Sequence, residues 1–210
     1  MLVPMAVEFL LVFIPMFIII DPFSVLPLFI TLTGSMNRAA RMKTLRYSIL
    51  FATSLLIVFS VLGKAILDYL SISIDALRIT GGLLLLVIGV SMLYEGDTPR
   101  SRRKGEEEVE EKQLPEDVAF VPLGTPMLAG PGAMSVVIIL SGTSEIPLVI
   151  ASLVTVMLVS TLILVRADLI FKLIGKAGTR ALTRVMGLLA SAYAVQMILD
   201  GVSDYAGTLG

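Results

Sequence analysis

FIIIDPFSVLPLF, residues 17–29, places an aspartate and a proline together inside a stretch that is otherwise apolar enough to cross a bilayer. A charged side chain at the centre of a membrane helix costs about 2.5–3.5 kcal/mol on insertion scales. A proline inside a helix removes a backbone donor and clashes with the preceding turn. We therefore predict that one helix ends near Ile20 and another begins at Pro22, with Asp21 as the N-cap between them.

A second interrupted helix is expected in the other half of the chain. Residues 121–135 read VPLGTPMLAGPGAMS, and by the same reasoning Gly130 caps a helix that restarts at Pro131. Backbone left unpaired at membrane depth is tolerated only where it is buried in protein or lines a cavity. The two breaks therefore predict a binding site.

The composition places the chain among proteins that cross a membrane several times. Of its 210 residues 56% are hydrophobic, the mean hydropathy is +0.94, and apolar runs of about 20 residues recur. Cysteine and histidine are absent, which excludes disulfides and thiolate metal sites and removes the commonest general base. Asp21 has no acidic partner at the second break, where Gly130 stands, so we predict neither an enzyme nor a catalytic or metal site.

The apolar runs predict an all-α integral membrane protein with six transmembrane spans. They cover approximately residues 3–33, 47–63 (extending towards 70), 79–94, 118–141, 146–165 and 185–199. Residues 95–117 hold a basic cluster followed by an acidic run, which is typical of a solvated linker. We divide the chain into a first three-span repeat, 1–96, a charged cytoplasmic linker, 97–117, and a second repeat, 118–210, which together form one membrane domain.

The two halves match each other weakly. At an offset of 105 residues, Gly82-Leu83-Leu84 falls on Gly187-Leu188-Leu189, and the two interrupted first spans match at slightly larger offsets. Because three spans per half is an odd number, the second repeat is expected to be inverted relative to the first. Inverted repeats whose first span is a discontinuous helix are typical of secondary transporters with a site near the bilayer midplane.

Positive charge sets the expected orientation. Of the 16 lysine and arginine residues, 14 lie in the segments that follow the first, third and fifth spans, including a basic loop at 38–46 and a basic stretch at 166–184. By the positive-inside rule these segments face the cytoplasm, and both termini lie outside the cytoplasmic membrane. Since the basic residues follow membrane topology, we expect lipids as partners and no nucleic acid.

Three motifs carry a family resemblance: IDPFSVLPLF at 20–29, RITGGLLLLVIGVSML at 78–93 and PLGTPMLAGPGAMS at 122–135. Together they resemble the MarC-related family, which includes small neutral amino acid transporters of SnatA type. The resemblance covers nearly the whole chain. It implies six spans, two interrupted helices and transport of small neutral amino acids such as glycine and alanine by a secondary-active or channel-like mechanism. We expect no cofactor, and a proton or sodium is a candidate coupling ion.

A zwitterionic amino acid presents one carboxylate and one ammonium. Helix N-termini attract the carboxylate, whereas Asp21 and the bare carbonyls of the stopped helices suit an ammonium or a coupling cation. The predicted substrate-binding residues are Ile20, Asp21, Pro22, Phe23 and Ser24 at the first break and Ala129, Gly130, Pro131, Gly132 and Ala133 at the second.

The sequence is also compatible with several other functions. The chain could export other small metabolites or drugs, act as a channel-like amino acid facilitator, or serve a structural or sensory role without transport. Asp21 could be only a helix cap. The sequence does not distinguish import from export, and it leaves open whether the chain forms a homo-oligomer.

Overall fold

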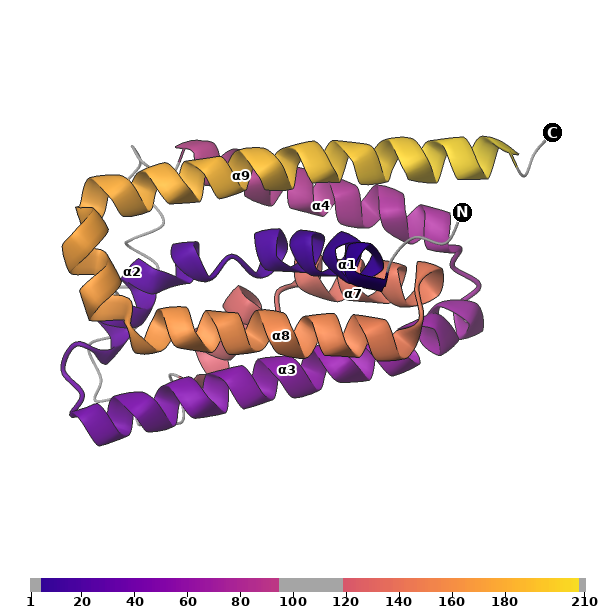
Figure 1. The fold of residues 1–210 in the computed structure, drawn as a ribbon. Helices are drawn as coiled ribbons and strands as arrows, with labels where there is room; N and C mark the ends of the chain where they lie inside the picture. Colours follow the sequence, from indigo (N-terminus) through magenta and orange to yellow (C-terminus); the bar gives the residue numbers. More distant parts are fainter. Residues whose placement is uncertain (1–4, 95–118, 208–210) are drawn as a thin grey trace.

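The computed structural model describes residues 5–94 and 119–207, and this part of the chain is helical without strands. The helices are α1 (Met5–Ile20), α2 (Pro22–Thr33), α3 (Arg38–Tyr69), α4 (Ile74–Tyr94), the π-helical η1 (Ala119–Leu128), α7 (Pro131–Thr143), α8 (Ile146–Val165) and α9 (Ala167–Gly207) (Figure 1). Five helical stretches in the described ranges are long and apolar enough to cross a membrane, with α1 and α2 counted as one. The prediction of an all-α membrane protein is confirmed; the predicted linker 97–117 lies outside the described residues.

Both predicted helix breaks are present. Asp21 adopts a left-handed backbone conformation (φ 37°, ψ 73°) between α1 and α2, and Pro22 is the first residue of α2. Gly130 is extended (φ −73°, ψ 167°) between η1 and α7, and Pro131 is the first residue of α7. The half-helix before this second break is a π-helix, which suits a ten-residue segment holding a glycine and two prolines that cannot donate backbone hydrogen bonds.

Two sequence-based boundaries are wrong. The predicted basic loop 38–46 forms the first turns of α3, because Asn37 caps this helix by accepting a hydrogen bond from the Ala40 N–H at 2.8 Å. The predicted basic stretch 166–184 and the span 185–199 belong to a single element, α9, interrupted only at Gly175 (φ 67°, ψ 179°). In both cases the helix begins before the apolar run, and every basic side chain of these two stretches except Arg41 is exposed.

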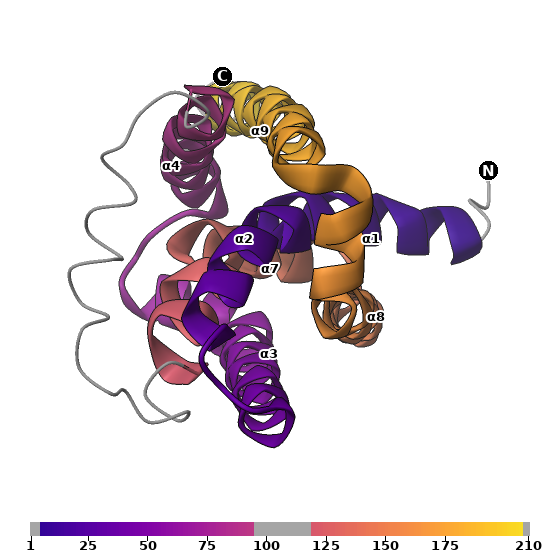
Figure 2. The ribbon, with the colours of Figure 1, turned by 90° about the vertical axis from the view of Figure 1, so that its left-hand side faces the viewer.

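The helices form two layers with the interrupted helices between them. In Figure 2, α4 and α9 lie together on one side and α3 and α8 on the other, while α2 and α7 occupy the middle. The beginning of α1 projects sideways past α8, and its last turns enter the centre of the bundle (Figures 1 and 2). The two breaks therefore lie in the interior, enclosed by the longer helices.

Glycines let α4 and α9 pack with their backbones close together. A Cβ atom added at Gly89 would lie 2.4 Å from the Ser191 hydroxyl oxygen and 2.8 Å from the Gly187 carbonyl oxygen, so no side chain fits there. Gly82 and Gly201 make similarly close contacts with the opposite helix. Small residues at a helix interface are the usual route to tight packing in lipid, so this pair forms one wall around the breaks.

Outward-facing positions of the long helices are apolar. Exposed large hydrophobic side chains include Leu83, Val87, Leu158, Leu162, Leu188 and Leu199. So much exposed apolar surface is rare on a protein surrounded by water, and it matches the hydrocarbon core of a bilayer.

Candidate functional site

Asp21 is the central residue of the candidate site. Within residues 5–94 and 119–207 it is the only acidic or basic residue that is buried, with 4% of its surface exposed. No lysine or arginine of the described ranges forms an ion pair with it. An intramembrane carboxylate of this kind is costly to keep, and such residues commonly mark substrate or ion pathways.

Ser24 supplies the hydrogen bonds that hold this carboxylate. The Ser24 N–H donates to Asp21 Oδ1 at 3.4 Å, and the Ser24 hydroxyl donates to Asp21 Oδ2. The positive end of the α2 dipole also faces the carboxylate, because Asp21 is the N-cap of this helix. Each carboxylate oxygen has a second lone pair available for a further donor.

Thr183 of α9 is the third polar residue here, and sequence reasoning missed it. Its hydroxyl oxygen lies 3.4 Å from the Ser24 hydroxyl oxygen, although the two residues are 159 positions apart. Thr183 falls in what the sequence presents as a basic stretch between spans. Only the contact between α2 and α9 reveals it, since no local pattern marks the residue.

The second break offers an N-terminus that no side chain caps. Gly130 has no side-chain group, and Pro131 has no N–H, so the first backbone donors of α7 are those of Gly132 and Ala133. The first helical hydrogen bond of α7 joins the Met134 N–H to the Gly130 carbonyl oxygen at 3.0 Å. Gly132 is buried against α4, where an added Cβ would lie 2.6 Å from Leu85 Cδ2.

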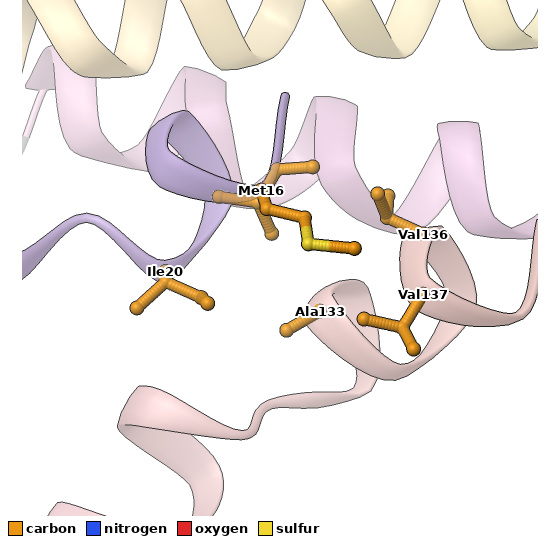
Figure 3. Close-up of a pocket in the computed structure, with 6 residues that line it drawn as sticks. Met16, Ile20, Ala133, Val136 and Val137 are labelled. Atoms are coloured by element: carbon orange, nitrogen blue, oxygen red, sulfur yellow. The ribbon is translucent and has the colours of Figure 1, made fainter. Parts of the chain in front are cut away.

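The two breaks face each other. α1 contacts α7 and α2 contacts η1, which is the pairing expected of two antiparallel broken helices that cross at their interruptions. Figure 3 shows the gap between them, with Met16 and Ile20 of α1 opposite Ala133, Val136 and Val137 of α7. The gap is lined only by apolar side chains and is too narrow to admit a water molecule.

The structure places most of the predicted site residues in this interior, and the exceptions are Pro131 and the side chain of Phe23. Ile20 and Ala133 line the gap, and the buried residues Asp21, Pro22, Ala129 and Gly132 lie around the breaks, with Ser24 and Gly130 half-buried. Pro131 is exposed. Phe23 is half-buried and packs its ring edge-on against Phe17, with the ring centroids 6.2 Å apart, so its side chain serves packing.

Met16, Val136 and Val137 also line the gap and were not predicted. Helical spacing could have found them, because Met16 precedes Ile20 by one turn and Val137 follows Ala133 by one turn. No group of three acidic side chains that could hold a metal ion occurs in the described ranges. Asp21 is the buried carboxylate there that could attract a cation.

These features define an integral membrane protein of the polytopic helical class, with a buried carboxylate at one of two facing helix breaks. The sequence profile of the MarC family of integral membrane proteins matches residues 6–206, and the chain belongs to this family. The predicted family resemblance is confirmed.

The chain is 36% identical over 198 residues to the UPF0056 membrane protein MJ1677 of Methanocaldococcus jannaschii, covering 92% of this chain and 95% of that protein. It is 31% identical over 198 residues to the UPF0056 inner membrane protein MarC of Escherichia coli (strain K12), covering 88% of this chain and 89% of that protein. It is 28% identical over 200 residues to the UPF0056 membrane protein PYRAB13050 of Pyrococcus abyssi, covering 95% and 96% respectively. No solved structure matches the chain.

Proposed function

We propose that this protein carries small neutral amino acids of the glycine and alanine class across the cytoplasmic membrane. Transport proceeds by alternating access at the two helix breaks, with no catalytic residue and no cofactor. The observation that supports this proposal is the buried Asp21 carboxylate, unpaired with any cation of the described residues, at a break that faces the uncapped N-terminus of α7.

The two charges of an amino acid match this pair of features. Asp21 accepts the ammonium through the lone pairs that Ser24 leaves free. The N-terminus of α7, with the N–H groups of Gly132 and Ala133, attracts the carboxylate. The sequence suggested both restarted half-helices as carboxylate sites, but Asp21 already caps α2, so we assign the substrate carboxylate to α7 alone.

The apolar lining of the gap limits the size of the substrate. Ile20, Val136 and Val137 fill the space between the breaks and leave no room for a water molecule, so the breaks must separate to admit a substrate, and a small side chain needs the least opening. Charge pairing at the breaks together with this narrow apolar gap favours glycine and alanine over larger amino acids. The closed gap also favours a carrier over an open channel, since a channel needs a continuous path.

The course of the helices supports six spans in two inverted repeats, 1–96 and 118–210. In Figure 1, α3 runs opposite to α8, α4 opposite to α9, and α1 with α2 opposite to α7. On this reading η1 and α7 together make the fourth span. The start of α3 and the start of α9 lie at one end of the bundle, where the basic residues gather, and we assign that end to the cytoplasm and both termini to the outside.

The test is uptake of radiolabelled glycine and alanine by proteoliposomes holding the purified protein, with pH and sodium gradients imposed separately. We expect saturable uptake by the unaltered protein and at least a ~10-fold loss in Asp21→Asn, because a charge-assisted hydrogen bond contributes about 1.5–3 kcal/mol. Asparagine tolerates the left-handed conformation and still caps a helix, so this variant should insert and unfold like the unaltered protein. Absence of uptake by the unaltered protein, or full uptake by Asp21→Asn, would contradict the proposal.

A further inference from the structure

Hydroxyl groups on the described helices mostly bond to their own helix. The side chains of Thr33, Thr53, Thr155, Thr161 and Thr179 each donate to the carbonyl oxygen four residues earlier. This is the usual behaviour of threonine in a membrane helix, and it carries no information about ligands. Thr183 differs, because its hydroxyl contacts Ser24 of another helix.

The Ser24 hydroxyl lies between two acceptors. It donates to Asp21 Oδ2, its shortest contact, which in the ionised carboxylate can only accept. In the longer contact the Ser24 hydroxyl is again the donor, and the Thr183 hydroxyl oxygen accepts at 3.4 Å. The two contacts together restrict the rotation of the Ser24 side chain and keep its hydroxyl beside Asp21.

We propose that Thr183 is a positioning residue of the transport site. It acts through Ser24, holding that hydroxyl towards Asp21 and so fixing the carboxylate in the orientation that receives the substrate ammonium. Without Thr183, the Ser24 hydroxyl is free to turn to a carbonyl of its own helix, as other hydroxyls in this protein do. This inference rests on the proposed function, because the role concerns the same site.

The contact also brings α9 to the site. Gly175 interrupts α9 in a conformation that only glycine adopts readily, so Thr183 belongs to the long segment that follows this interruption. The same segment packs tightly against α4 through Gly187 and Gly201. The Thr183–Ser24 contact therefore connects the interrupted helix α2 to the α4–α9 pair.

The experiment compares four variants in the uptake assay: Thr183→Val, Thr183→Ser, Ser24→Ala and the double variant Ser24→Ala/Thr183→Val. Valine keeps the shape of threonine but has no hydroxyl to accept the Ser24 hydrogen bond, so we expect the KM for alanine to rise about 3- to 10-fold with a smaller change in Vmax. Serine restores the hydroxyl and should bring KM within about 2-fold of the unaltered protein. In the Ser24→Ala background, Thr183→Val should add no further effect, because the residue it acts through is gone.

Thr161→Val is the matched control, since the Thr161 hydroxyl bonds only within α8, to the Met157 carbonyl oxygen at 2.7 Å, and its loss should leave KM unchanged. An unchanged KM in Thr183→Val, or a Thr183→Ser variant as impaired as Thr183→Val, would overturn the inference while leaving the proposed function intact if Asp21→Asn is inactive. A full Thr183→Val effect in the Ser24→Ala background would also overturn it. Absence of uptake by the unaltered protein would overturn both.

A second measurement does not depend on transport. The chain has no cysteine, so a Ser24→Cys/Thr183→Cys variant reports only the introduced pair. Because the two hydroxyl oxygens lie 3.4 Å apart, we expect a disulfide to form on mild oxidation and to resolve as a band shift on a non-reducing gel. Failure of this pair to cross-link in the membrane would contradict the contact on which the inference depends.

Discussion

Asp21 combines a strained backbone with a buried charge. A left-handed conformation at a residue other than glycine costs about 1–3 kcal/mol, and aspartate is among the residues that tolerate it best. The hydrogen bonds from Ser24 offset part of this cost, because they cap α2 at the same time. Strain and charge concentrated at one buried residue are typical of a functional position.

Gly175 allows a direct test of backbone strain at a single position. Its φ of 67° and ψ of 179° lie in a region that L-residues rarely enter, yet nothing lies within 4 Å of an added Cβ. We expect Gly175→Ala to lower the free energy of unfolding by about 1–3 kcal/mol through strain alone. The measurement is the midpoint of thermal unfolding in detergent.

Gly207→Ala is the control for this prediction. Gly207 also has no neighbour within 4 Å of an added Cβ, but its backbone is helical, so alanine should leave the midpoint unchanged or slightly raised. Equal midpoints for the two variants would show that Gly175 is not held in the left-handed region.

At the scale of single elements, the α4–α9 pair depends on close backbone contact. Adding a methyl group at Gly89 places it 2.4 Å from the Ser191 hydroxyl oxygen, so the helices must separate or the serine must move. We expect Gly89→Ala to destabilise the protein by about 1–3 kcal/mol, in the range of other overpacked interiors. Thermal unfolding in detergent again measures the effect.

Val87→Ile provides the comparison on the same helix. Val87 is 68% exposed and faces lipid, so an added methylene has room and should leave the unfolding midpoint within error. If Gly89→Ala were as stable as Val87→Ile, the close contact between α4 and α9 would not exist in the membrane.

The sequence predicted those helix boundaries that depend on interactions between neighbouring residues. The Asp21–Pro22 and Gly130–Pro131 pairs marked both breaks because capping and proline geometry act within a few residues. The start of α3 was missed although Asn37 is a readable N-cap, since the basic residues after it were taken as a loop. The continuation of α9 through Gly175 could not be predicted, because helix on both sides of a strained glycine is set by packing against other elements.

Some residues of the candidate site could be predicted from the local sequence and others could not. Asp21 and Ser24 were predicted from the residues around them, and Ile20 and Ala133 line the gap as the two predicted breaks implied. Thr183 reaches the site only through the contact of α9 with α2, which no local pattern encodes. The sideways course of α1 in Figure 2 is likewise a property of the assembled helices.

At the scale of the whole molecule, ion pairs connect α9 to its neighbours near both of its ends. Arg41 of α3 bonds to Asp168 at 2.6 Å and lies over the Phe29 ring of α2 at 4.9 Å, while Arg78 of α4 pairs with Asp204. Both aspartates are more than half exposed, so neither pair adds much stability. The gap between the breaks is also closed, which in the proposed transport cycle corresponds to an occluded stage.

The central claim is that substrate passes between the two facing breaks, and a reversible cross-link tests it most directly. Ile20 of α1 and Ala133 of α7 line the same gap, and the chain has no cysteine of its own. In proteoliposomes holding Ile20→Cys/Ala133→Cys, we expect oxidation to form the disulfide and to stop alanine uptake, and reduction to restore it, while each single variant keeps its uptake under oxidation. A pair that does not cross-link, or a cross-linked protein that transports at the full rate, would contradict the account.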